Sequence, residues 1–585
     1  MIQALLAKAE LGENVYITDV RDAFSLGGTK IVCMLEPAIG AMRQWELRLP
    51  QTEDPRELAF VQEYFYACIY NIISTFGGLR MALCLSPEDA FAQSICATLQ
   101  DVFQVGLAKS GRSGYGKCLN VADRINAAFG QPPFAFHTGT HEADVRVEQP
   151  AAGAEALSAF HAASQKARSA TLCGIDIGGT DIKVIGTRNG RITAVKEFDW
   201  NPSEMTKVED VIDKVLLMTD LMAAVMSLPN TPQARNLRAE MLNKDASVDE
   251  MRGAIRLAAD TFGPPLLFDG IGVCFPDVVL NDIIVGGETY KTRGIRAASN
   301  DYEEEFARLK KLPLLILERC RQDGAVHIAN DGSLAAYTAA VEIAHSPDSG
   351  MVTDGVLAHT LGTEFGSGWI DESGAIPQIP LEIYNCIIDI GNYPARAYDV
   401  NDVRSVNNFN TGLSGTLQKY CSQSGAYRLA MRMFETCEPQ RIDELFDRGF
   451  LSRRGGGVYV AAQPADMRKP LLEYLMRLAS GGDAVSEQIF REIGEFLAVT
   501  FEETEFLLRQ KTKLRVLLGR FVKHQRCSEL MQEGVNRRLS TQFVSGDSDL
   551  AFTPLMKDLR DDPEHTIAQF GQAVGAAHFV ASVLN

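Results

Sequence analysis

The sequence predicts a mixed α/β fold, and three observations lead to this prediction. Residues 173–188 read Cys-Gly-Ile-Asp-Ile-Gly-Gly-Thr-Asp-Ile-Lys-Val-Ile-Gly-Thr-Arg, with alternating apolar residues on both sides of a glycine turn. Residues 356–370 repeat this pattern of strand, glycine turn and strand. A third apolar run ends at Asn330-Asp331 and passes directly into residues with helical spacing. Alternation is typical of strands, and apolar residues three or four apart are typical of helices.

Length and composition describe an ordinary globular protein. The 585 residues predict about three to four domains. The net charge of −18, from 57 basic and 75 acidic residues, argues against a nucleic-acid-binding surface. The 12 cysteines are scattered without a Cys-x-x-Cys pair, which predicts neither disulfides nor a cysteine zinc cluster and fits a reducing cytosol. We read no signal peptide and no membrane span, and therefore expect a cytoplasmic protein.

The first 150 residues are predicted to form a separate α+β domain of unknown role. Residues 15–20 and 29–35 have the pattern of strands, and residues 55–75 have that of a helix with a buried face. The segment Leu26-Gly-Gly-Thr-Lys30 echoes the later glycine turn but has Phe24 or Ser25 where a carboxylate would be needed. We interpret it as a plain hairpin turn.

Two further motifs in this region are interpreted as surface loops. Gly111 to Cys118 has the spacing of a Walker A motif, but Cys118 replaces the hydroxyl residue that binds Mg²⁺. His137 and His141 have helical spacing, yet Gly139 and the flanking threonines favour a loop over a metal site. Residues 151–170 turn alanine-rich and are predicted to form a helical linker.

The glycine turn at residues 178–180 lies in a β-hairpin, because Asn189-Gly190 offers a second two-residue turn into another strand, residues 191–198. A hairpin of this kind holds phosphate with turn amides and the Thr180 hydroxyl. Asp176 would point into the same cleft and could hold Mg²⁺ through water. The alternative is a glycine hairpin that binds nothing.

The remaining elements follow in order. Residues 203–262 are mostly helical, and a strand follows at residues 268–277. The strand that ends at Asn330-Asp331 places a carboxylate where open α/β sheets bind ligands, although Asp331 could instead only cap the next helix. A late strand, residues 514–518, ends at Gly519, and a helix closes the chain at residues 568–584.

These motifs, in this order, resemble the ROK branch of the sugar kinase, Hsp70 and actin superfamily. The resemblance implies a two-lobed actin-like ATPase (ribonuclease H-like) fold. Lobe I would span residues 171–330 and lobe II residues 331–585, with the last helix returning to lobe I. The N-terminal α+β domain would be an addition to this fold.

The resemblance also implies ATP-dependent phosphorylation of a sugar hydroxyl, of the hexose or N-acetylhexosamine class, with Asp331 as the general base. The implied sugar-binding residues are Asn330, Glu288 and Glu382. The two glycine hairpins would face each other and hold the nucleotide. The implied residues around ATP and Mg²⁺ are Asp176, Gly178, Gly179, Thr180, Lys183, Gly362, Thr363, Gly366, Gly368 and Gly519.

Two departures from the family pattern keep other functions open. Phe409, Thr411, Thr416 and Gln418 occupy the Cys and Glu positions of the family's zinc segment, so we expect no structural zinc. Glu364 replaces a glycine of the second phosphate motif and would repel phosphate unless it points outward or meets Mg²⁺. The alternatives are a non-catalytic sugar or nucleotide sensor that uses the N-terminal domain for assembly, and an ATPase that drives a partner. We expect a small-molecule sugar partner and neither nucleic acid nor membrane, and we leave a homodimer open.

Overall fold

The computed structural model describes residues 1–139, 154–286, 292–393, 398–455, 457–463, 465–512, 514–545 and 550–584. The chain divides into two compact units. Unit 1 consists of Met1–Gln149, His359–Ser367 and Ile379–Gly546, and unit 2 consists of Pro150–Ala358, Gly368–Gln378 and Asp547–Asn585. The domain boundaries predicted at residues 150, 170 and 330 stay a prediction. Unit 1 joins the predicted N-terminal domain with much of the predicted lobe II.

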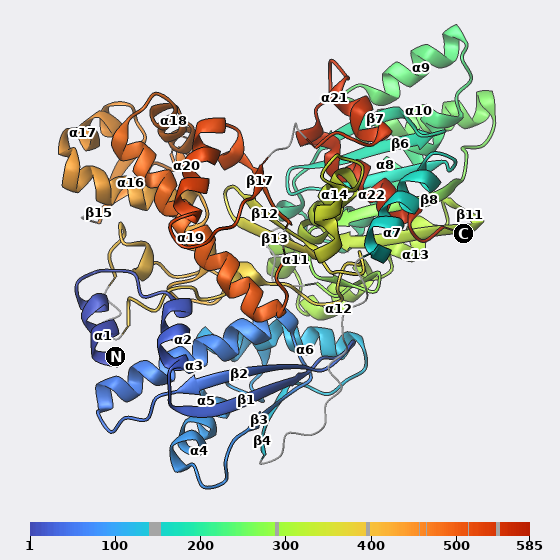
Figure 1. Ribbon diagram of the computed structural model, residues 1–585. Coiled ribbons are helices and arrows are strands. Elements are labelled where there is room, and N and C mark those ends of the chain that lie inside the picture. The colour runs from blue at the N-terminus through green and yellow to red at the C-terminus, as the bar shows by residue number, and fades with distance from the viewer. Residues whose placement is uncertain are drawn as a thin grey trace. The chain divides into compact units, whose positions relative to one another are not determined.

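Unit 2 is built on a five-stranded sheet in the order β11-β8-β5-β6-β7, which Figure 1 shows in green and teal. Its strands are β5 (Leu172–Ile177), β6 (Asp181–Arg188), β7 (Arg191–Asp199), β8 (Phe268–Phe275) and β11 (Cys320–Asn330). Strand β6 is antiparallel to β5 and β7, whereas β8 is parallel to β5 and β11. Numbered along the chain the order is 3-2-1-4-5, the arrangement of ribonuclease H-like domains. The predicted α/β, actin-like fold class is therefore confirmed.

Helices cover both faces of this sheet. Cys173 and Ile175 share a core with helix α8 (Val208–Ser227), whereas Leu172, one position earlier, packs with α22 (Ile567–Ala581). Because side chains alternate along a strand, α8 and α22 lie on opposite faces. The other helices of the unit are α7 (Ala154–Ala167), α9 (Pro232–Leu242), α10 (Val248–Phe262), α11 (Arg293–Ala298), α12 (Tyr302–Leu309), α13 (Leu312–Leu317), α14 (Asp331–Ala344) and α21 (Pro554–Arg560). Strands β9 (Val279–Leu280) and β10 (Ile283–Ile284) form a short ribbon.

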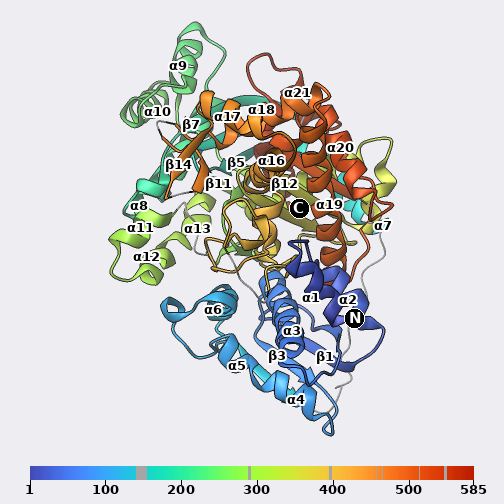
Figure 2. The same ribbon diagram turned by 90° about the vertical axis from the view of Figure 1, so that its left-hand side faces the viewer.

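The N-terminal part of unit 1 is a four-stranded sheet with helices. The strands lie in the order β2-β1-β3-β4 and are β1 (Thr29–Glu36), β2 (Arg43–Leu49), β3 (Arg80–Cys84) and β4 (Ala135–Gly139). The helices are α1 (Ile2–Glu10), α2 (Ile17–Ser25), α3 (Pro55–Phe76), α4 (Ala90–Ala97), α5 (Leu99–Val102) and α6 (Cys118–Ala128). Figure 2 shows α1 beside the long helix α3. Asp54 begins α3 by accepting hydrogen bonds from two backbone amides, as an N-cap residue does.

The rest of unit 1 contains a group of helices and most of a second sheet, in which residues 356–358 and 368–370 count with unit 2. The sheet has the order β13-β12-β16-β17, and its strands are β12 (Val356–Leu361), β13 (Phe365–Ile370), β16 (Leu514–Gly519) and β17 (Val544–Ser545). The turn between β12 and β13 belongs to this unit. The helices are α15 (Leu417–Tyr420), α16 (Gln423–Cys437), α17 (Pro439–Asp447), α18 (Arg468–Ser480), α19 (Ala484–Leu508) and α20 (Gln525–Val535), next to the ribbon of β14 (Leu451–Arg454) and β15 (Gly457–Val460).

Three local predictions in the first 150 residues are wrong. Residues 15–20, predicted as a strand, lead into helix α2, because Ile17, Val20 and Phe24 form a buried face at helical spacing. The segment at residues 26–30, predicted as a hairpin turn, instead connects α2 to β1. His137 lies in strand β4 and not in a loop, since this segment pairs in parallel with β3. His141 lies outside the described residues.

Two predictions for connecting segments have different outcomes. The Walker-like segment, predicted as a surface loop, contains two short 3₁₀ turns, Lys109–Gly111 and Gly114–Lys117, before α6 begins, but Arg112, Tyr115 and Cys118 are buried, so this prediction is confirmed only in part. The predicted turn at Asn189-Gly190 is confirmed. The connection between β6 and β7 is a turn in which Asn189 and Gly190 both have positive φ, at 54° and 70°. Within the described part of the chain, no helix is long and apolar enough to cross a membrane.

Candidate functional site

The tip of the first glycine hairpin, between β5 and β6 in unit 2, is closed by its own backbone. The Gly178 amide donates to the Asp181 carbonyl oxygen at 2.8 Å. A Cβ atom at Gly178 would lie 2.7 Å from Asp181 Oδ1 and 2.8 Å from that carbonyl oxygen, so a larger residue does not fit. Trp200, which directly follows β7, stabilises the tip, because its indole nitrogen donates to the Gly178 carbonyl at 3.1 Å.

Two of the predicted nucleotide-binding side chains at this tip meet a carboxylate of the hairpin itself. Lys183 forms an ion pair with Asp181, and the Thr180 hydroxyl donates to Asp181 Oδ2 at 3.0 Å. Asp181 was not among the predicted site residues, although it follows Thr180 directly in the motif. It gathers both side chains at the hairpin tip.

Asp176 stands near the end of β5, opposite Lys183 in the strand register. Burial raises the pKa of Asp176 to about 6. Lys183 and a hydrogen bond from Cys274 lower this pKa, whereas the carboxylates of Asp331 and Asp181 raise it. Asp331 thus lies close enough to act on Asp176, as expected for two residues at the carboxyl ends of strands in one parallel set.

The sequence left open which residue of the Asn330-Asp331 pair caps helix α14. Asn330 is the N-cap of α14, since its Oδ1 accepts from the amides of Gly332 at 2.9 Å and Ser333 at 3.4 Å. Its Nδ2 donates to the Asp277 carbonyl at 3.0 Å. The Asp331 side chain is exposed and accepts from the Gly332 amide at 2.9 Å. The capping position therefore belongs to Asn330, and the Asp331 carboxylate stays open to solvent.

The remaining predicted residues of unit 2 differ in their surroundings. A Cβ atom at Gly368 would lie 1.8 Å from the Gly332 carbonyl oxygen, so this glycine lets β13 approach the start of α14. That packing role is sufficient to explain the residue without a phosphate. Glu288 lies outside the described residues.

The second glycine hairpin, between β12 and β13, carries Thr363 and Glu364 exposed at its tip in unit 1. The Gly362 amide donates to the Glu364 carbonyl at 3.1 Å, and the Gly362 carbonyl accepts from the Gln423 amide, at the start of α16, at 3.0 Å. At Gly366 an added Cβ atom would make only ordinary contact, with Thr360. Gly519, at the end of β16, has a φ of 93°, and a Cβ atom there would lie 2.6 Å from the Leu361 carbonyl oxygen. The close packing of β16 against β12 thus explains why residue 519 is a glycine.

The segment at residues 409–418, for which no structural zinc is expected, is held by amide side chains. Asn408 Oδ1 accepts from the amides of Asn410 at 2.8 Å and Thr411 at 3.3 Å, and its Nδ2 donates to Asn385 Oδ1 at 3.0 Å. Asn385 in turn donates to Glu382 Oε2 at 3.0 Å, and the Tyr384 hydroxyl donates to the same oxygen at 2.6 Å. No group of three or more His, Cys, Asp or Glu residues that could hold a metal ion occurs among the described residues.

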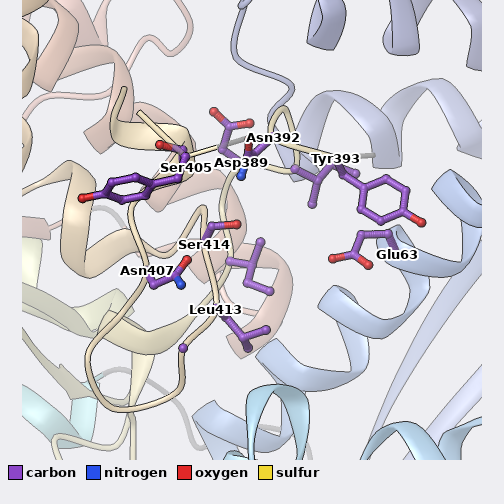
Figure 3. Close-up of a pocket in the computed structure, with 12 residues that line it drawn as sticks. Glu63, Asp389, Asn392, Tyr393, Ser405, Asn407, Leu413 and Ser414 are labelled. Atoms are coloured by element: carbon purple, nitrogen blue, oxygen red, sulfur yellow. The ribbon is translucent and has the colours of Figure 1, made fainter. Parts of the chain in front are cut away.

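A polar cavity of about 210 Å³ adjoins this segment in unit 1 (Figure 3). Figure 3 shows Glu63 and Tyr393 on one side, Ser405 and Asn407 on the other, and Asp389 between them. The Asp389 carboxylate is fully used in holding the chain, because it accepts from the amides of Val15 and Gly391 and from the Tyr420 hydroxyl. Burial raises the pKa of Asp389, in keeping with a structural role.

Comparison with known proteins gives structural matches only. No family model and no curated protein matches the sequence. Among the solved structures, a ROK-family glucokinase from Streptomyces griseus in complex with glucose and AMPPNP matches with a TM-score of 0.35 and 16% identity, over 70% of this chain and 97% of that chain. A ROK hexokinase from Thermus thermophilus matches with a TM-score of 0.38 and 13% identity, over 69% of this chain and 97% of that chain.

A ROK-family transcriptional regulator, described as a homologue of the E. coli MLC protein, matches with a TM-score of 0.39 and 11% identity, over 71% of this chain and 81% of that chain. This chain is thus similar to both sugar kinases and a regulator. TM-scores this low lend no weight to either function, so the site's own residues have to carry the proposal.

Proposed function

We propose that this protein is an ATP-dependent sugar kinase of the ROK type, with Asp331 as the general base. The observation that carries the proposal is the pair of carboxylates, Asp176 and Asp331, at the carboxyl ends of strands β5 and β11, which are both parallel to β8. Asp331 is exposed and is not the cap of α14, so a hydroxyl group can approach it. Asn330 holds the start of α14 and thereby fixes the position of this base.

In the proposed reaction, Asp331 accepts the proton of the sugar hydroxyl while that oxygen attacks the terminal phosphorus of ATP. A general base of this kind contributes about 10²- to 10⁴-fold to the rate. The hairpin amides and the Thr180 hydroxyl would hold phosphate oxygens, and Lys183 would need to share its charge between Asp181 and the nucleotide. Asn330, Glu382 and Glu288 remain the proposed sugar-binding residues. The remaining work is positioning and charge neutralisation, as in phosphoryl transfer generally.

Asp176 is the residue that would hold a magnesium ion, through water. Mg²⁺ prefers oxygen ligands and retains several waters, so a single carboxylate together with the phosphate groups of the nucleotide would be enough. Burial is the main reason why the pKa of Asp176 is raised, and a cation there would favour the ionised carboxylate. When bound, Mg²⁺ would neutralise charge on the phosphate groups.

The test is a sugar-dependent release of ADP. Wild type and Asp331→Asn are each given Mg-ATP with a panel of hexoses, N-acetylhexosamines and polyols. We expect the substitution to lower kcat about 10²- to 10⁴-fold with little change in KM, because only the transition state loses an interaction. Asp323→Asn is the matched control, since Asp323 is an exposed carboxylate on the same strand.

A second candidate function is a sensor that binds sugar or nucleotide without turnover. The exposed Glu364 at the tip of the second hairpin favours it, because a carboxylate there opposes phosphate. Saturable binding with no ADP release for any sugar would support the sensor. ADP release that needs no sugar would support an ATPase instead.

A further inference from the structure

The polar cavity of unit 1 (Figure 3) is lined by residues that the proposed kinase site does not use. Among the described residues that line it, none is a proposed catalytic, sugar-binding or nucleotide-binding residue. Glu63 comes from α3, in the N-terminal part of unit 1, and the others lie between residues 387 and 414. The volume of about 210 Å³ is below the range of about 300 to 1,000 Å³ for pockets that hold drug-sized ligands. The cavity therefore fits a single small molecule.

Three polar side chains at this cavity are available to a ligand. Asn392, Asn407 and Ser414 form no side-chain hydrogen bond with any other described residue. Two amides and a hydroxyl together offer several donors and several acceptors. The Ser405 hydroxyl, in contrast, is already used, because it donates to the Asp399 carbonyl at 2.7 Å. A ligand that both donates and accepts hydrogen bonds would satisfy the three available side chains.

Two of these side chains lie at the base of one loop. The Asn408 amide donates to the Leu413 carbonyl at 2.7 Å and closes the loop, so Asn407 and Ser414 lie next to each other at its base (Figure 3). The backbone thus fixes both side chains at one wall of the cavity. Groups that are held in place before binding lose little conformational freedom when a ligand arrives.

The charge of the cavity favours a neutral ligand. No Lys, Arg or His occurs among the lining residues that the structure describes, whereas Glu63 and Asp389 both carry carboxylates. A buried phosphate would find no compensating cation among these residues. A cationic ligand is not required either, since Asp389 accepts three hydrogen bonds from the protein and Glu63 accepts one from the Tyr115 hydroxyl at 2.7 Å. One of the bonds to Asp389 comes from the Gly391 amide and so holds the backbone next to Asn392.

Apolar side chains form the rest of the lining. Ile387 and Ile390 are buried, and Leu413 is half-buried. Tyr398 adds an aromatic ring with a polar end, and its exposure of 65% means that the cavity can be reached from solvent. A compound with hydroxyl groups at its edges and C–H groups on its faces matches both kinds of surface.

We propose that this cavity is a second ligand site, which binds a small neutral polyhydroxy compound, either a monosaccharide or an open-chain polyol. The hydroxyl groups of the ligand exchange hydrogen bonds with Asn392, Asn407 and Ser414, and its C–H groups pack on Leu413 and the two isoleucines. The site uses residues outside the proposed kinase site, so the inference goes beyond the proposed function and does not depend on it.

The experiment measures binding of D-glucose, N-acetyl-D-glucosamine and D-sorbitol to the full chain by calorimetry, without nucleotide. Asn407→Ala combined with Ser414→Ala should weaken the binding of at least one compound about 5- to 100-fold, the combined range for losing two hydrogen bonds between neutral groups. The matched control is Asn410→Ala, in the same loop but not at the cavity, which should bind as the wild type does. Sugar bound at the proposed kinase site contributes equally to all three proteins, so the difference between them reports the cavity alone.

Comparison of the three compounds identifies the ligand. Loss of binding in the double variant for the two sugars alone supports a monosaccharide, and an equal loss for sorbitol supports recognition of an open-chain polyol. The proposal is overturned if the wild type binds none of the three compounds, or if the double variant binds all of them as Asn410→Ala does. It is also overturned if D-glucose 6-phosphate binds as tightly as D-glucose with the same dependence on Asn407 and Ser414.

The kinase proposal and this one fail independently. ADP release is not measured in the binding experiment, so a chain that never turns over sugar can still lose binding in the double variant. The melting temperature of the double variant should equal that of the wild type, because neither side chain holds the loop through hydrogen bonds to other described residues.

Discussion

At the scale of single residues, Asp176 couples the candidate site to the stability of the protein. Burial raises the pKa of Asp176 from its ordinary 3.8 to about 6 in the folded state. Between these two pH values the folded protein binds more protons than the unfolded chain, so stability falls as the pH rises from about 4 to about 6. Above about pH 6 the ionised carboxylate therefore lowers the free energy of unfolding by about 3 kcal/mol.

We expect Asp176→Asn to raise the free energy of unfolding by about 1 to 3 kcal/mol near pH 8, where the wild-type carboxylate is ionised. Near pH 4 the gain should almost vanish, because the wild-type group is then protonated. Urea unfolding at a series of pH values measures this difference. Asp323→Asn should show no such dependence, and a constant offset for Asp176→Asn across the series would contradict the assignment. The sugar-kinase activity of Asp176→Asn should also fall if Asp176 assists Mg²⁺.

At the scale of elements, helix α22 is seated on the sheet of unit 2 through glycines. A Cβ atom at Gly272 in β8 would lie 1.8 Å from the Ala576 carbonyl oxygen, and one at Gly174 in β5 would lie 1.9 Å from that of Ala573. Gly272→Ala should lower the free energy of unfolding by about 3 kcal/mol, because the helix would have to move away from the sheet. Thermal and urea unfolding measure this loss. Gly253→Ala on α10, where an added Cβ atom meets nothing, should instead stabilise by about 0.5 to 1 kcal/mol.

Elements with a strong local pattern could be predicted from the sequence. The strands β5, β6 and β7 follow from alternation and from the turn at Asn189-Gly190, and α3 follows from its long apolar face. Residues 15–20 were wrongly predicted as a strand because the segment is too short to show helical spacing. The buried face of α2 can be recognised only when Phe24 is included. Strand β4 forms through parallel pairing with β3, which no local pattern reveals.

In the candidate site, too, only the features that depend on adjacent residues could be predicted from the sequence. The placement of Asp331 after a strand and at the start of a helix could be read from the sequence, because it depends on adjacent residues. That Asn330 takes the capping role could not, since it depends on the geometry of a single turn. The pairing of Lys183 with Asp181 and the polar cavity of unit 1 likewise depend on side-chain positions and on segments distant in sequence.

At the scale of the whole molecule, unit 1 is assembled from segments far apart along the chain. Trp45 Nε1 donates to the Leu507 carbonyl at 3.0 Å, and Asn71 on α3 exchanges hydrogen bonds of 2.8 Å with both backbone groups of Ile387. The first 149 residues therefore share one compact unit with residues 379–546. Bringing the two segments together closes a long loop of the chain, which costs conformational entropy. Because this entropy is lost before any single contact can compensate for it, we expect the contacts between the two segments to form together.

Asn71 is the residue at which this assembly can be tested. It is fully buried, and Asn71→Ala would leave both backbone groups of Ile387 and the Glu503 carboxylate without this partner. Because each buried polar group left unsatisfied costs about 1 to 3 kcal/mol, we expect unit 1 to lose at least about 3 kcal/mol. A background of Trp200→Phe with Trp369→Phe leaves Trp45 as the single tryptophan of the three, so that fluorescence in urea follows unit 1 alone. Asn536→Ala, at an exposed position after α20, should leave the midpoint unchanged. An unshifted midpoint for Asn71→Ala would mean that the first 149 residues fold independently of residues 379–546.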